Sequence, residues 1–82
     1  MNRIDISNSI ATMLLEEGIG SSVSPIDCYN YWAQKNRIRI TDPDTASWTL
    51  KIIKSLLTTD KHVLTSFLND NIEEVKIWEK RQ

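Results

Sequence analysis

The sequence predicts an α+β domain in which three helices precede a C-terminal β-hairpin. Two helix-start signals that contain proline, "SPID" and "DPD", each come before a segment with apolar residues at helical spacing. The last third instead has two segments rich in β-branched and aromatic residues, "VLTSFL" and "EEVKIW", separated by the turn-forming "NDN". We expect one domain over residues 1–82, with an all-α bundle of four to five helices as the alternative.

The first helix is expected within "DISNSIATMLLEEG", residues 5–18. Asp5 or Ser7 can begin it, because a short polar side chain accepts a hydrogen bond from a free N–H of the first turn. Gly18 follows the last periodic residue and suits the left-handed conformation after a helix. The apolar residues at helical spacing are Ile6, Ile10, Met13 and Leu14.

The second helix is expected to begin at Ser24 as the N-cap, with Pro25 at the first helical position. Asp27 in the first turn places a negative charge at the positive end of the helix dipole. The helix should end near "QKN", residues 34–36. One face is expected to carry Ile26, Tyr29 and Ala33, with Cys28 and Trp32 beside it.

The segment "RIRIT", residues 37–41, alternates charge and isoleucine as a half-buried strand does. A third helix should then span residues 43–57, with Asp42 as N-cap, Pro43 at the first helical position and Asp44 in the first turn. Its predicted buried stripe is Ala46, Leu50, Ile53 and Leu57, widened by Trp48, Ile52 and Leu56. Its predicted outward residues are Ser47, Lys51, Lys54, Ser55 and Thr58, with Thr45 at the entrance.

The C-terminal third permits two interpretations. In a hairpin, Val75 and Ile77 would share one face, where Val63, Thr65 and Phe67 can meet them. In a helix, Asn71 and Glu74 would imitate a capping box. The residues that also fit a helical period are Leu64, Leu68, Ile72 and Val75. We expect the hairpin.

Composition indicates a folded domain and gives no catalytic signal. Of 82 residues, 40% are hydrophobic and 26% are charged, which is ordinary for a globular protein. Cys28 is the one cysteine and no apolar run suggests a signal peptide or membrane span, so we expect a cytoplasmic protein. His62 is the one histidine, and without further ligands at matched spacing we expect no metal, no cofactor and no enzyme activity. The tryptophans, Trp32, Trp48 and Trp78, are expected at the core or its edge.

Positive charge is concentrated in the middle of the chain. Residues 35–66 carry six basic and three acidic side chains, whereas residues 1–34 carry one basic and four acidic ones. The net charge of the chain is −1, so this middle segment is the part that can present a positive field to phosphates.

The order helix, short extended link, helix, helix and hairpin resembles that of winged helix-turn-helix DNA-binding domains, from about Asp5 to Trp78. This resemblance implies that the third helix enters the major groove and that the hairpin tip, Asn69 to Asn71, contacts the flanking backbone. Lysine can donate to phosphates or to guanine, and small hydroxyl residues permit close approach to base edges. The DNA-binding residues that it implies are Arg37, Arg39, Thr45, Ser47, Lys51, Lys54, Ser55, Lys61, Asn69 and Asn71.

The first functional hypothesis is therefore a small regulator of transcription or replication that reads duplex DNA with the helix at residues 43–57. It would act as a dimer, since two copies can read paired half-sites, with Ile4 and Trp78 available for the interface. The alternative is a non-enzymatic protein-binding module, such as a phage or plasmid inhibitor that covers the surface of another protein. The slightly acidic chain would then suit a basic partner.

Overall fold

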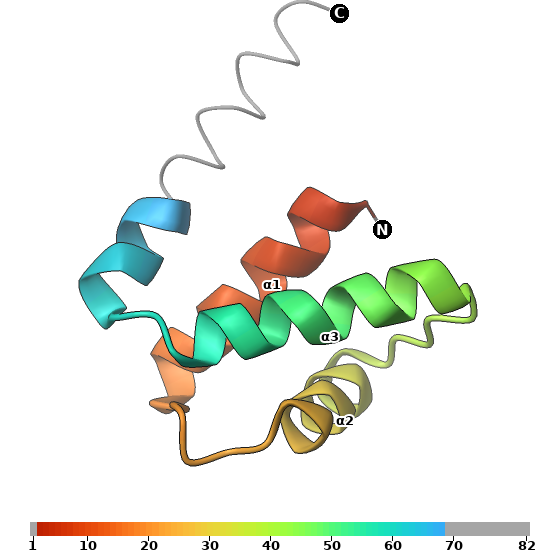
Figure 1. The fold of residues 1–82 in the computed structure, drawn as a ribbon, viewed down its shortest axis with the longest axis horizontal. Helices are drawn as coiled ribbons and strands as arrows, with labels where there is room; N and C mark the ends of the chain where they lie inside the picture. The colour runs from red at the N-terminus through yellow and green to blue at the C-terminus, as the bar shows by residue number, and fades with distance from the viewer. Residues whose placement is uncertain (1, 69–82) are drawn as a thin grey trace, which may run out of the picture.

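The computed structural model describes residues 2–68, which fold as α-helices joined by short connections (Figure 1). The helices are α1 (Arg3–Glu17), α2 (Pro25–Asn36) and α3 (Pro43–Leu57), and residues 61–68 are also helical. This part of the chain contains no strand. The predicted α+β class, a three-helix winged helix-turn-helix with a C-terminal hairpin, is therefore wrong, and the all-α alternative fits the described residues.

The helix at residues 61–68 replaces the first strand of the predicted hairpin. Asp60 begins it: its carboxylate accepts a hydrogen bond from the N–H of His62 at 2.8 Å, and its carbonyl accepts one from the N–H of Leu64 at 2.9 Å. Leu64 is buried in the core, whereas Val63 is 57% exposed. Burial of Leu64 outweighs the weak strand preference of its β-branched neighbours. The rest of the predicted hairpin, with its tip at residues 69–71, lies outside the described residues.

The predicted starts of α2 and α3 are confirmed. Ser24 Oγ accepts a hydrogen bond from the N–H of Asp27 at 3.2 Å, and Pro25 occupies the first turn of α2. Asp42 Oδ2 accepts one from the N–H of Thr45 at 2.9 Å, and Pro43 begins α3. Both caps satisfy donors that the helix itself leaves without partners.

The start of α1 differs from the prediction. Asn2 is its N-cap and accepts a hydrogen bond from the N–H of Asp5 at 2.8 Å, so neither Asp5 nor Ser7 begins the helix. Ser7 is buried within α1, and its hydroxyl donates to the carbonyl of Arg3 at 2.9 Å. Gly18 ends α1 in the left-handed conformation, with φ of 65°, as predicted.

The connection from α2 to α3 is not a strand. Arg37 ends α2 in the left-handed conformation, with φ of 52°, and the N–H of Ile38 donates to the carbonyl of Ala33 at 2.9 Å. Ile38 and Ile40 are half-buried against the core, whereas Arg37 and Arg39 are exposed. The alternation in "RIRIT" therefore predicted correctly which side chains are buried and which are exposed. The described residues contain no strand with which this segment could pair.

The core forms where α3 packs against both α1 and α2. Trp32 is fully buried and its indole N–H donates to Ser9 Oγ at 2.9 Å, while Trp48 is partly buried at the core edge, so both are placed as predicted. On α3 the inward stripe is shifted from the prediction, because Thr49 is fully buried and Leu50 is only half-buried. Thr49 tolerates burial because its hydroxyl donates to the carbonyl of Thr45 at 2.7 Å.

Candidate functional site

The outer face of α3 exposes to solvent four of the five residues of this helix that were predicted to bind DNA. Ser47, Lys51, Lys54 and Ser55 are exposed, as the sequence predicted. Thr45 is half-buried, and its hydroxyl donates to Asp42 Oδ2 at 2.6 Å, so its role is in the cap of α3.

The remaining predicted site residues lie elsewhere. Arg37 and Arg39 belong to the connection between α2 and α3. Lys61 lines a different hollow, formed by the loop after α1 and the turn after α3. Asn69 and Asn71 lie outside the described residues. The structure therefore brings together only Ser47, Lys51 and Lys54 around one hollow.

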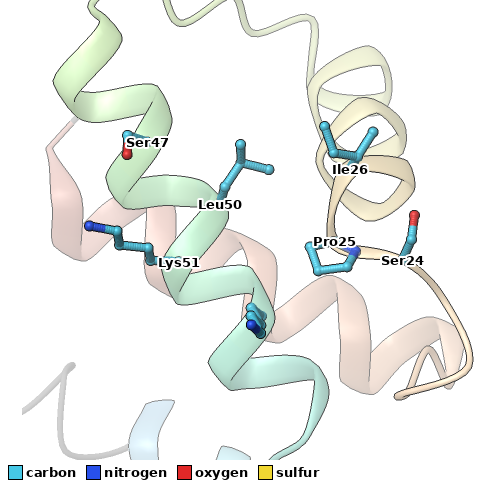
Figure 2. Close-up of a pocket in the computed structure, with 7 residues that line it drawn as sticks. Ser24, Pro25, Ile26, Ser47, Leu50 and Lys51 are labelled. Atoms are coloured by element: carbon cyan, nitrogen blue, oxygen red, sulfur yellow. The ribbon is translucent and has the colours of Figure 1, made fainter.

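That hollow lies between the start of α2 and the middle of α3, and we call it the α2/α3 hollow. It is open to solvent and has a volume of about 380 Å³. Figure 2 shows Leu50 directed from α3 toward Pro25 and Ile26 of α2, and Lys51 extending away from Leu50. The described lining residues are Ser24, Pro25, Ile26, Ser47, Leu50, Lys51 and Lys54.

The floor of the α2/α3 hollow is apolar because α2 and α3 bury other side chains in the core and leave some of their apolar side chains at the surface. On α2, Cys28 and Trp32 are buried, which leaves Ile26 in the first turn 58% exposed. On α3, Thr49 and Ile53 are fully buried, which moves Leu50 to the edge of the core. Helical spacing predicted Leu50 as a buried residue of α3 and placed Ile26 on one face of α2 with Tyr29 and Ala33. The structure leaves Leu50 half-buried and Ile26 exposed, both at this hollow.

The charge of the α2/α3 hollow is positive. Its described lining includes Lys51 and Lys54 and no carboxylate. Neither lysine forms an ion pair with any residue between 2 and 68; the ion pair recorded in that range joins Lys35 and Glu17. Asp42, near the start of α3, is held in its cap, where hydrogen bonds from the hydroxyl and N–H of Thr45 lower the pKa of its carboxyl.

A second polar cluster ties α1 to α2. Glu17 accepts a hydrogen bond from Lys35 Nζ at 2.6 Å and another from the hydroxyl of Tyr31. The Lys35 bond, followed by the Tyr31 bond, lowers the pKa of Glu17, and the same contacts raise the pKa of Lys35 and of Tyr31. Because these partners satisfy one another, the cluster holds the helices together rather than presenting a reactive group.

The described residues offer little for catalysis or metal binding. Cys28 is buried, and burial raises the pKa of its thiol, which opposes formation of the nucleophilic thiolate. No group of three or more His, Cys, Asp and Glu side chains within residues 2–68 is placed to hold a metal ion. None of the helices in this range has the length and apolar character needed to cross a bilayer.

Comparisons with protein-family models, with curated protein sequences and with solved structures found no match.

Proposed function

We propose that this chain is a protein-interaction module that binds its partner through the α2/α3 hollow. The observation that carries the proposal is the exposed apolar floor, in which Ile26 is 58% exposed beside Leu50, next to two lysines without ion-pair partners among the described residues. Protein-binding surfaces combine such an apolar centre with a polar rim. Binding a partner would remove the floor from water, which is the main favourable contribution to association.

The rigidity of the hollow supports the same function. Pro25 and Ile26 belong to the first turn of α2, which Ser24 caps, and Leu50 belongs to the middle of α3. Side chains on capped helices are already ordered before binding, so ordering them would cost little of the binding free energy. The hollow is small, near the lower end of the roughly 300–1,000 Å³ of ligand pockets, which suits an anchoring side chain.

The test compares two substitutions at equally exposed apolar residues. Ile26→Asp places a charge in the floor of the hollow, and Val63→Asp is the control, because Val63 is 57% exposed on the helix at residues 61–68. Each full-length variant, checked for folding by circular dichroism, is used to capture proteins from the host. We expect Ile26→Asp to lose partners that the wild-type chain and Val63→Asp retain. Equal recovery by all three would contradict the proposal.

Duplex DNA is the second candidate, because Ser47, Lys51, Lys54 and Ser55 are all exposed on one helix. If DNA is the ligand, Lys51→Ala combined with Lys54→Ala should weaken binding to labelled duplex and make its affinity less dependent on salt. Ile26→Asp would then have a smaller effect than the lysine pair.

A further inference from the structure

We propose that the α2/α3 hollow recognises an acidic peptide segment of a partner protein. One aliphatic side chain of the segment would lie between Ile26 and Leu50, and its carboxylates would face Lys51 and Lys54. This inference rests on the proposed function and adds the chemistry of the partner. It also reverses the expectation from net charge, since a chain of net charge −1 suggests a basic partner whereas the hollow itself is basic.

The charges around α2 indicate where an acidic segment can bind. The α2/α3 hollow has two lysines and no carboxylate in its described lining. Another hollow, which also borders α2, is lined by Glu17 and Asp27 and has no basic residue among its described lining residues. Glu17 is paired with Lys35, so the charge that repels an acidic segment from the second hollow is that of Asp27. A segment rich in Asp and Glu is attracted to the lysines of the first, so complementary charge favours the α2/α3 hollow over the other.

The spacing of the lysines fits carboxylates on a peptide. Ser47, Lys51 and Lys54 are separated by four and three residues, so they form one row along α3. Lys51 and Lys54 are about 4.5 Å apart along the helix axis, from a rise of about 1.5 Å per residue. Carboxylates three or four residues apart on a helical peptide have a similar separation, so both lysines can be engaged at once.

The apolar floor distinguishes a peptide from a nucleic acid. The phosphate backbone of duplex DNA can satisfy the two lysines, but it carries no aliphatic side chain to fill the space between Ile26 and Leu50. An aliphatic side chain flanked by carboxylates matches both parts of the hollow. The observations therefore favour an acidic peptide, and DNA becomes one outcome of the test.

The experiment selects binders from a library of random peptides displayed on phage, with the full 82-residue chain as target. Affinities of the selected peptides are then measured by fluorescence anisotropy for four proteins: the wild type, Ile26→Asp, the double variant Lys51→Glu/Lys54→Glu, and Val63→Asp as control. Labelled random-sequence duplex DNA is measured in parallel. Circular dichroism verifies that each variant keeps its helices.

The expected peptides carry Asp or Glu beside Leu, Ile or Val. The lysine double variant should weaken their binding by about tenfold, since two partly exposed charge pairs become repulsive. Ile26→Asp should also weaken it by about tenfold or more, because it places a charge in the anchor site. Val63→Asp should leave binding unchanged.

Peptides that require Ile26 but show no excess of Asp or Glu would overturn the acidic assignment and keep the proposed function. Failure to select any peptide, or equal affinities for Ile26→Asp and Val63→Asp, would overturn both. Duplex DNA that binds more tightly than every selected peptide, and that depends on Lys51 and Lys54 but not on Ile26, would assign the surface to nucleic acid.

Discussion

Ile26 and Arg37 show how local backbone geometry, rather than residue type, decides what a side chain does here. Ile26 is apolar but 58% exposed, because α2 directs Cys28 and Trp32 inward instead. Arg37 is charged and was predicted to bind DNA. In the structure it ends α2 in the left-handed conformation, with φ of 52°. A position of this kind is most often glycine, since a side chain crowds the backbone there.

Replacing Arg37 by glycine should therefore stabilise the protein. Relief of the left-handed strain exceeds the added flexibility of the unfolded chain, and we expect a gain of about 0.5–1 kcal/mol in the free energy of unfolding. Arg39→Gly is the matched control, because the backbone at Arg39 shows no positive φ and glycine there only adds unfolded-state entropy. Urea denaturation measures both, and a loss of stability in Arg37→Gly would contradict this account.

At the scale of whole elements, the starts of α2 and α3 and the end of α1 could be predicted better than the type of the element after Asp60. The residues that start or end a helix act on the backbone next to them, so their roles could be predicted from the sequence. They are Ser24 with Pro25, Asp42 with Pro43, and Gly18. Whether the segment after Asp60 forms a strand or a helix depended on which of two neighbours, Val63 or Leu64, is buried in the core. The spacing of apolar residues in so short a segment is compatible with both structures.

Alanine substitution at these two neighbours tests the helix at residues 61–68. Leu64 is 3% exposed, so Leu64→Ala should lower the free energy of unfolding by about 2–3 kcal/mol. Val63 is 57% exposed, so Val63→Ala should change it by less than about 0.5 kcal/mol. The predicted hairpin face contains Val63, so a larger loss at Val63 than at Leu64 would restore the strand interpretation.

The contact between α1 and α2 through Glu17 should depend on pH. Hydrogen bonds from Lys35 and Tyr31 lower the pKa of Glu17 in the folded state below its ordinary value of 4.5. Its contribution to stability is therefore present above about pH 4.5 and is lost as the pH falls through the lower, folded-state pKa.

Glu17→Gln should accordingly lower the thermal midpoint at pH 7, and the difference from wild type should shrink in acid. Thermal unfolding followed by circular dichroism from pH 7 to about pH 2 measures this dependence. Glu16→Gln removes a carboxylate from the same turn and controls for the change in net charge. A difference between Glu17→Gln and wild type that is the same at every pH would contradict a role for the charged cluster.

For the molecule as a whole, the candidate site was predicted in part. Exposure of Ser47, Lys51 and Lys54 followed from the polar stripe of α3. Leu50 was assigned to the buried stripe of α3, and Ile26 was placed only on a shared face of α2, because a helical period identifies an apolar stripe but not which of its edges a neighbouring helix covers. Their exposure results from how α2 and α3 pack, which is a property of the assembled domain.

The most direct test of the α2/α3 hollow as a protein-binding surface is a titration of the ¹⁵N-labelled full chain with a selected peptide, followed by backbone amide NMR. We expect the largest shifts at the residues that line the hollow: Ser24, Ile26, Ser47, Leu50, Lys51 and Lys54. Amides near Val63, on a different helix, should change little. Shifts that cluster around Val63, or around Glu17 and Tyr31, and leave the hollow unaffected would contradict it.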